Sequence, residues 1–362
     1  MSFFYIWNQV IVLNNKFFNN IKDYDLENKS NRNHLTFDEV YLITREIIES
    51  INPNYLKDYD NLIEKGILNF DYSNYQSDDE DVCGNYKADY IDLIRKKYNQ
   101  TKMEINSTNN DKKNYTITKS SEFIHDSDIH NEINIIREFN YTDVIQLVHE
   151  FIHYVTGKTS NKSLNRYLLA EFFAIYFETY AKDYLIKKGI SKDEIDYKDR
   201  LRFLYQDAEE FYEYESPLVA YSYFGDVSDK SYELLNEYVI CNLNKDVFDY
   251  ECYNLLDYFE SIDLMHQDSN QLKQCRSDLR QEYTEFFSDH FKYLWGTLLT
   301  FYARSYCNLE DIVKMNDEIL TYDGNIIKCL EKMGIMIYEP DFCDKISKSI
   351  DEFICEDEIK KR

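Results

Sequence analysis

The apolar positions of Thr142–Gly157 predict a helix that is buried on all sides. They do not form a single stripe but cover every face of the helix, which is typical of a core helix. The apolar side chains are Val144, Ile145, Leu147, Val148, Phe151, Ile152 and Val155. Thr142 or Asp143 is expected as the N-cap of this helix, and Gly157 as its C-terminal stop.

A second apolar run, Leu164–Lys188, predicts a long helix after a short polar loop. Ser163 is expected to cap its start and Gly189 to end it. Because the connecting loop, KTSNKS, is short, we expect the second helix to fold back antiparallel to the first.

Helix-start signals recur along the rest of the chain. Thr36 and Glu39 form a capping box, Pro53 stands at a first helical position, and Ser191 with Glu194 forms a second capping box. The pattern of apolar residues predicts further helical pieces at about 87–98, 230–242, 246–263 and 271–304.

Two segments before the buried helix have the composition of strands. They read TITKS and EINIIREF, and the second directly precedes Thr142–Gly157. The chain of 362 residues has only 3 prolines and 8 glycines, which disfavours many tight turns and favours long helices. We therefore expect a mainly α fold with a small β-sheet before the buried helix. The polar stretch NSTNNDKKN is the best linker candidate, so we expect a helical N-terminal region over 1–110 and a second domain over 111–362.

The buried helix carries three ionisable residues past its first turn, His149, Glu150 and His153. Each would cost roughly several kcal/mol if it were buried without a partner. His149 and His153 are four positions apart, so their imidazoles project from one face and can reach one ion. This H-E-x-x-H arrangement is that of a zinc site with two neutral imidazole ligands. Glu150 stands beside them, placed to take a proton from water that the metal activates.

The second predicted helix offers a third ligand. Glu171 follows His153 by 18 positions, which lets an antiparallel helix present its carboxylate to the same ion. Two imidazoles and one carboxylate leave a fourth position for water, the open coordination of a catalytic zinc rather than a structural one. Glu178 lies two turns further on the same face, either as an orienting partner of a ligand or as a substitute ligand.

A rival metal site is conceivable around His125 and His130, which stand between the two strand-like segments. Histidines in such a connecting segment are more often ordinary surface residues than ligands. The H-E-x-x-H helix is therefore the favoured metal site.

The run NYTDVIQLVHEFIHY, followed by AEFFAIYFE, resembles the zinc oligopeptidases of the thimet oligopeptidase and oligopeptidase F family. In that family, a helix of the pattern DVxTLxHExGH precedes a helix of the pattern AExxxxxxE, whose first Glu is the third zinc ligand. Two later segments, FKYLWGTLLTFYA and IIKCLEKMGIMIYEPDFCDKISKSIDEFI, also resemble parts of the family. The resemblance spans about Tyr141 to Glu358.

This resemblance implies a helical, zincin-like metallopeptidase fold with zinc as its cofactor. It implies that Asn134–Phe139 is the edge strand that holds a peptide substrate by main-chain hydrogen bonds. It also implies hydrogen-bond donors for the developing oxyanion in the segment 289–306. There we expect Tyr293, His290 and Tyr302 as catalytic groups.

We therefore expect a zinc-dependent, oligopeptidase-like metallopeptidase in which Glu150 acts as general base. The alternative is a catalytically inactive zincin-like binding or effector protein. It arises because Ile152 stands where the family has Gly, and because the interval from His153 to Glu171 is shorter than in the family. A third reading is an amide hydrolase that acts on something other than peptides.

Charge and cysteine content narrow the partners and the compartment. A net charge of −26 repels phosphate backbones, so we expect no nucleic acid as a partner. The metallopeptidase interpretation implies a peptide or protein substrate. The 8 cysteines include no C-x-x-C pair, which indicates reduced thiols of an intracellular protein. The N-terminal SFFYIWNQVIVL lacks the features of a signal peptide, and no run reaches the length of a membrane span. We expect a cytoplasmic protein, or an effector exported without a signal peptide, that does not associate with membranes.

Overall fold

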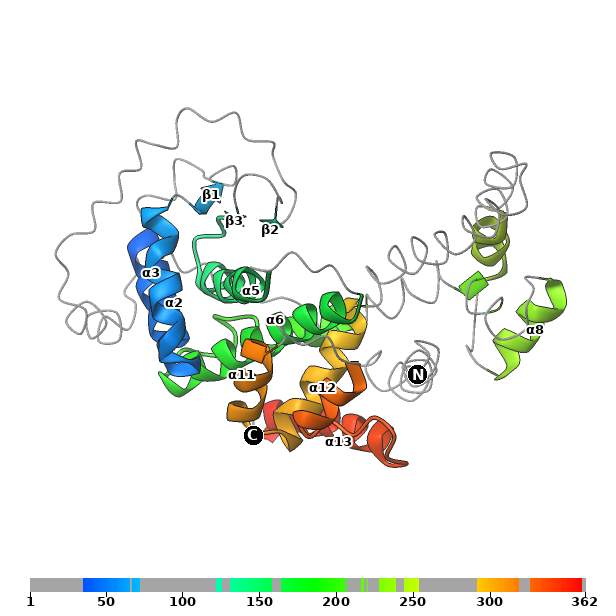
Figure 1. The fold of residues 1–362 in the computed structure, drawn as a ribbon. Coiled ribbons are helices and arrows are strands. Elements are labelled where there is room, and N and C mark those ends of the chain that lie inside the picture. The colour runs from blue at the N-terminus through cyan, green and yellow to red at the C-terminus, as the bar shows by residue number, and fades with distance from the viewer. Residues whose placement is uncertain are drawn as a thin grey trace. The chain divides into compact units, whose positions relative to one another are not determined.

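Two compact units make up the fold in the computed structural model (Figure 1). The helix-pair unit comprises Glu27–Lys198 and Asn308–Asn325, and the second unit comprises Met1–Leu26, Asp199–Cys307 and Ile326–Arg362. The structure describes residues 35–65, 67–71, 122–125, 131–157, 164–204, 206, 216–217, 220, 228–238, 244–253, 292–318 and 326–359. These described residues are mainly helical, as the sequence predicted.

The predicted helix pair consists of α5 (Tyr141–Gly157) and α6 (Leu164–Lys187), which pack along each other. The two helices run antiparallel. His149 of α5 contacts Glu178 of α6, whereas His153, one turn later in α5, contacts Glu171, two turns earlier in α6. This antiparallel direction is the one that the sequence predicted.

Gly189 ends α6 as predicted. Its φ of +92° lies in the left-handed region, which glycine adopts without a steric cost. The N–H of Gly189 donates to the carbonyl of Ile186 (2.9 Å), and the N–H of Ile190 donates to that of Leu185 (3.1 Å). This pair of bonds is a Schellman motif, which satisfies the last carbonyl groups of the helix.

A three-stranded sheet precedes α5 in the chain. It consists of β1 (Leu68–Asp71), β2 (Glu122–His125) and β3 (Asn131–Ile136), in the spatial order β1-β3-β2. β3 pairs parallel to β1, with Leu68 opposite Ile133, and antiparallel to β2, with Phe123 opposite Ile133. Ile133 and Ile135 are fully buried, and α5 packs on both β3 and β2.

The expected edge strand Asn134–Phe139 is wrong in both position and role. The strand is Asn131–Ile136, and among the described strands it is the central one. β1 pairs with Ile133–Ile136 on one side of β3, and β2 pairs with Asn131–Asn134 on the other, so β3 lies between two strands instead of at the edge of the described sheet. Local composition marks a strand but does not say which strands will flank it. The TITKS segment lies outside the described residues.

A buried ion pair ties the end of β3 to the start of α5. Arg137 Nη1 lies 2.7 Å from Asp143 Oδ2, and both side chains are buried. Asp143 also accepts hydrogen bonds from the N–H groups of Glu138 (2.7 Å) and Phe139 (3.1 Å), which holds Phe139 at a φ of +59°. Arg137 Nη2 donates to the carbonyl of Leu35 (2.6 Å). Burial raises the pKa of Asp143 to about 6, although Arg137 and the two N–H groups lower it, so the carboxylate is ionised at neutral pH.

The cap of α5 differs from the prediction. Asn140, rather than Thr142 or Asp143, precedes the helix, and its Oδ1 accepts a hydrogen bond from the N–H of Thr142 (2.6 Å). Asp143 lies in the first turn, where its carboxylate binds the N–H groups of the preceding loop. All three residue types are good caps, so the sequence pattern did not distinguish them.

The predicted helix starts near the N-terminus are confirmed. The described helices there are α2 (Phe37–Ile51), the 3₁₀ helix η1 (Pro53–Tyr55) and α3 (Leu56–Glu64). The side chains of Thr36 and Glu39 each accept a hydrogen bond from the other's N–H, which completes the capping box. The ring of Phe151 in α5 meets that of Tyr59 edge-on, with 5.2 Å between centroids, so α3 contributes to the packing around the helix pair.

α11 (Leu309–Glu318) joins the same unit from much later in the chain and packs on α6. Polar side chains connect it to η1: Tyr55 OH donates to Asp317 Oδ1 (2.5 Å), and Asn316 Nδ2 donates to Tyr55 OH (2.8 Å). Helices from the start and the end of the chain therefore both support the helix pair.

The units divide the chain differently from the boundary expected at 110. β1 pairs with β3, and α2 packs on both α5 and α6, so residues on both sides of that boundary form one unit. The polar NSTNNDKKN stretch lies outside the described residues. Its composition indicated a linker, but the strands on either side of it pair within one sheet.

The second unit contains α8 (Asp229–Tyr238), α12 (Ile326–Lys332), α13 (Phe342–Ile359) and helical residues at 199–204, 245–253 and 292–306. These agree with the predicted helices at 230–242, 246–263 and 271–304 as far as those ranges are described. The predicted helix at 87–98 lies outside the described residues. Ser191 and Glu194, in the helix-pair unit, form their capping bonds, but a turn follows them before helical residues begin at 199.

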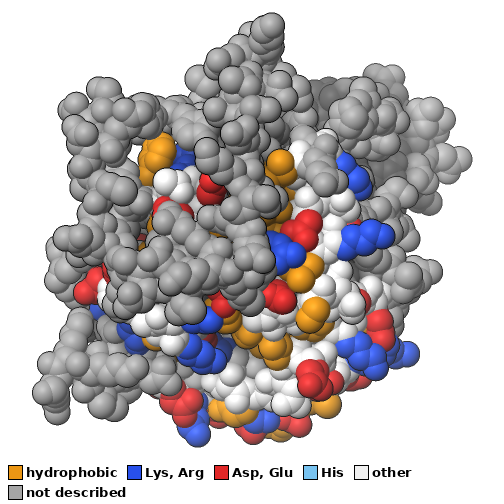
Figure 2. All heavy atoms as spheres, turned by 90° about the vertical axis from the view of Figure 1, so that its left-hand side faces the viewer, with side chains coloured by type: hydrophobic (Ala, Val, Ile, Leu, Met, Phe, Trp, Pro, Cys, Tyr) orange, Lys and Arg blue, Asp and Glu red, His pale blue; other side chains and the backbone are white. Residues whose placement is uncertain are grey.

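Figure 2 shows one face of the molecule, on which acidic and basic side chains of the described residues are interspersed with hydrophobic ones. The excess negative charge of the chain is therefore not gathered into one patch on the described part of this face. Among the described helices, none is both long and apolar enough to cross a membrane.

Replacing Asp143 by Asn is expected to lower the free energy of unfolding by about 3–5 kcal/mol, because Arg137 would be left buried without its counter-charge. Urea unfolding at neutral pH measures this change. The control is Glu352→Gln, which breaks the exposed Lys348–Glu352 pair (3.6 Å) and is expected to change stability by less than about 1 kcal/mol. Equal small effects in both variants would contradict the structural role of the buried pair.

Candidate metal centre

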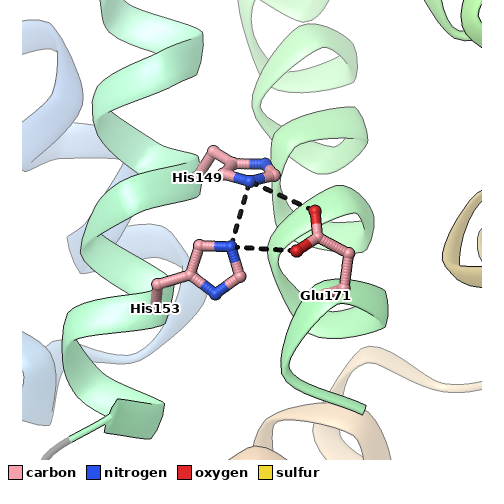
Figure 3. Close-up of side chains that lie close together, drawn as sticks. All are labelled: His149, His153 and Glu171. Atoms are coloured by element: carbon pink, nitrogen blue, oxygen red, sulfur yellow. Dashed lines mark hydrogen bonds and ion pairs between the residues drawn. The ribbon is translucent and has the colours of Figure 1, made fainter. Parts of the chain in front are cut away.

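Three side chains converge where α5 faces α6 (Figure 3). His149 and His153 stand one turn apart on α5, and Glu171 projects toward both from α6. The i, i+4 spacing puts the two imidazoles on one face, and the antiparallel packing brings the carboxylate opposite them. The structure thus brings together the three residues that the sequence predicted as metal ligands.

The distances between the three donor groups match those around a tetrahedral zinc ion. The Nε2 atoms of His149 and His153 are 3.1 Å apart. The carboxylate of Glu171 places Oε1 at 3.5 Å from Nε2 of His149 and Oε2 at 3.4 Å from Nε2 of His153. Ligand atoms about 2.05 Å from a tetrahedral zinc ion lie about 3.3 Å from one another. A zinc ion therefore fits between these groups without a large change in their spacing.

Glu178 lies on the opposite edge of the His149 ring. Its Oε2 is 3.2 Å from Nδ1 of His149, whereas Nε2 of the same ring faces Glu171. When Nδ1 carries the proton and donates a hydrogen bond to Glu178, the lone pair of Nε2 is left to bind a metal. This geometry corresponds to the orienting role predicted for Glu178 rather than to that of a substitute ligand.

The environment of His149 affects its affinity for protons in two directions. Burial lowers the pKa of His149, but the hydrogen bond to Glu178 and the charges of Glu150, Glu171 and Glu178 raise it, and the net shift is upward. The site therefore favours positive charge at this position. A metal cation satisfies the same preference.

Buried charged side chains surround His149, and most of them are negative. Glu150, Glu171, Glu178 and Lys182 are all buried, with exposed fractions of 6, 3, 4 and 1%. Three carboxylates and one ammonium carry a formal charge of −2. Protonated imidazoles cannot balance it completely, because two N–H groups would point at each other across the 3.1 Å between the Nε2 atoms. A dication between the imidazoles and Glu171 would offset part of the negative charge and lower the cost of burying it.

Glu150 follows His149 in α5, and its side chain is buried. It is therefore adjacent in the chain to a predicted ligand and shielded from bulk water. Its role as general base stays a prediction.

The other predicted catalytic groups belong to the second unit. Tyr293 and Tyr302 lie in the helical segment 292–306, and His290 lies outside the described residues. The Tyr293 side chain is 41% exposed, whereas Tyr302 is buried and its hydroxyl donates to the carbonyl of Gly334 (3.5 Å). Their roles stay predictions, because the ligand group is formed within the helix-pair unit alone.

The rival site receives no support from the described residues. His125 is not in the expected loop but is the last residue of β2. His130 lies outside the described residues.

Sequence reasoning missed Lys182. Its ammonium lies 3.1 Å from Oε1 of Glu178, one turn away in α6, and the side chain is 1% exposed. A lysine one turn after Glu178 within a mostly apolar helix was the signal that could have identified it.

Purified protein is expected to bind one equivalent of zinc and to unfold at a higher temperature with zinc than without it. At a free zinc concentration of 100 times Kd, the stabilisation is about 2.7 kcal/mol. His153→Ala is expected to abolish both effects, because it removes a ligand. Metal content and calorimetry measure them. His125→Ala is the matched control and should behave like the wild type; zinc loss in that variant instead would point to the rival site.

Comparison of the chain with protein-family models, with curated proteins and with solved structures found no match.

Proposed function

We propose that this chain is a zinc-dependent metallopeptidase of the oligopeptidase-like kind. The observation that supports the proposal most is the near-tetrahedral spacing of His149 Nε2, His153 Nε2 and the carboxylate of Glu171. This arrangement uses both histidines of an H-E-x-x-H helix and the first Glu of the following helix. The same two segments carry the resemblance to the thimet oligopeptidase and oligopeptidase F family.

The three ligands leave one coordination position open, which is typical of catalytic rather than structural zinc sites. A zinc ion held by these residues would activate a water molecule near neutral pH and polarise the carbonyl group of a peptide bond. Glu178 contributes by accepting a hydrogen bond from Nδ1–H of His149, which keeps Nε2 directed at the ion.

Glu150 is the proposed general base. It accepts a proton from the attacking water and returns that proton to the nitrogen of the leaving amine. Its support is its place in the motif, directly after His149, and the burial of its side chain, which strengthens its electrostatic interactions.

Tyr293, His290 and Tyr302 are the proposed donors to the developing oxyanion. The support for them is the resemblance of their segment to the peptidase family. Tyr293 is the strongest of the three candidates, because its side chain is partly exposed while the Tyr302 hydroxyl already donates to the carbonyl of Gly334. Burial raises the pKa of Tyr302, so its phenol keeps the proton that a donor needs.

The proposed partner is a peptide or a protein substrate, because the proposed reaction hydrolyses peptide bonds. A net charge of −26 disfavours nucleic acid as a partner, since it repels phosphate backbones. The 8 cysteines of the chain include no C-x-x-C pair, and the described Cys252, Cys329 and Cys343 are buried, which supports a reducing compartment such as the cytoplasm. An effector exported without a signal peptide would first fold in the same compartment.

Glu150→Gln is expected to keep one equivalent of zinc and to lower kcat by about 10²–10⁴-fold, because the amide cannot accept the proton. Digestion of a peptide library, with and without a chelator, measures turnover. Glu310→Gln, at an exposed position of α11, is the matched control and should retain wild-type activity. Cleavage by Glu150→Gln at the wild-type rate would rule out the mechanism, and a zinc-loaded wild type that cleaves no peptide would favour the non-catalytic alternative.

Tyr293→Phe is expected to lower kcat by about 10²–10³-fold with little change in KM, because an oxyanion donor acts mainly in the transition state. Steady-state kinetics on a peptide found in the library digest measures both constants. Tyr302→Phe is the matched variant and is expected to have the smaller effect. A reversed order of the two losses would assign the donor role to Tyr302.

A further inference from the structure

Lys182 is a charged side chain in the interior of α6. Its exposed fraction is 1%, and its Nζ lies 3.1 Å from Oε1 of Glu178, one helical turn earlier. A lysine loses considerable hydration and rotamer freedom when it is buried so completely. A buried lysine in this mostly apolar helix therefore needs a specific explanation.

The carboxylate of Glu178 connects this lysine to the metal centre. Its Oε1 faces Lys182 Nζ at 3.1 Å, and its Oε2 faces Nδ1 of His149 at 3.2 Å. The other nitrogen of the same imidazole, Nε2, faces Glu171 and His153. Lys182, Glu178 and His149 thus form a continuous relay from the interior of α6 to a predicted metal ligand.

A lysine at this position restricts the orientation of the carboxylate. The terminal torsion angle of a glutamate side chain has a broad distribution. A contact with His149 alone therefore leaves the carboxylate free to rotate. A second, charge-assisted contact to the other oxygen removes that freedom and directs Oε2 at the imidazole. The imidazole then presents Nε2 to the ion in one orientation.

We propose that Lys182 is a positioning residue of the metal centre, which acts through Glu178 to hold His149 in its metal-binding orientation. This inference rests on the proposed zinc function. A merely structural role would be different: Lys182 would then stabilise α6, and its loss would lower zinc affinity no more than the loss of any other ion pair of that helix.

The test compares zinc affinities of Lys182→Met, Glu178→Gln and the double variant by competition with a chromogenic chelator. We expect Lys182→Met to weaken zinc binding about 10-fold and Glu178→Gln about 10–100-fold. The double variant should equal Glu178→Gln alone, because the proposed effect of Lys182 on His149 passes through Glu178. If the double variant instead loses zinc affinity by the product of the two single losses, the relay is overturned.

Lys188→Met is the matched control. Lys188 follows the last residue of α6 and forms an ion pair with Glu46 (2.7 Å), so the variant removes the same charge from the same helix without touching the relay. Its zinc affinity should stay within about twofold of the wild type. A loss equal to that of Lys182→Met would assign both effects to net charge or helix stability, and would overturn the proposal.

The outcomes separate this inference from the proposed function. Zinc binding by the wild type together with unchanged binding by Lys182→Met overturns the relay alone, whereas a wild type that binds no zinc overturns both. If Lys182→Met does not fold, nitrogen NMR of the histidine-labelled, metal-free wild type tests the step of the relay from Glu178 to His149. The relay requires the Nδ1–H tautomer of His149, and the Nε2–H tautomer would refute it.

Discussion

Two imidazoles and a carboxylate meet only because α5 and α6 run antiparallel with His149 beside Glu178 and His153 beside Glu171. This register places hydrogen-bonding groups on both edges of the His149 ring. It also buries several like charges together, which is unfavourable unless a cation or a proton compensates them. The spacing of the nitrogen and oxygen atoms fits a tetrahedral metal ion, so a metal offers the more complete compensation.

Much of the surrounding fold serves to fix these two helices. The ion pair of Arg137 with Asp143 joins β3 to the start of α5, and the Schellman motif at Gly189 ends α6. α2 packs on both helices, and α11 supports α6 from a distant part of the chain. The three side chains of the candidate metal centre therefore project from regular helices with defined ends, which is how rigid sites are usually built.

Lys182 extends this reasoning beyond the ligands themselves. Metal sites in proteins depend on the groups that orient their ligands. In the candidate site, Glu178 contacts His149 through one oxygen and the buried ammonium of Lys182 through the other. The cost of burying Lys182 is offset by its contact with Glu178, so the helix tolerates a charge that its apolar surroundings would otherwise disfavour.

The sequence by itself determined the helix pair, because its apolar pattern and the stop at Gly189 are local signals. It also identified His149, His153 and Glu171 as candidate metal ligands. Helical periodicity puts the two histidines on one face of their helix, and the 18 positions from His153 to Glu171 let a second helix fold back toward them. Only the tertiary structure decided that β3 is central, that Glu178 faces Nδ1 rather than the ligand edge, and that Lys182 joins the cluster. Strand neighbours and contacts between helices depend on residues far apart in the chain, and no local pattern encodes their relative placement.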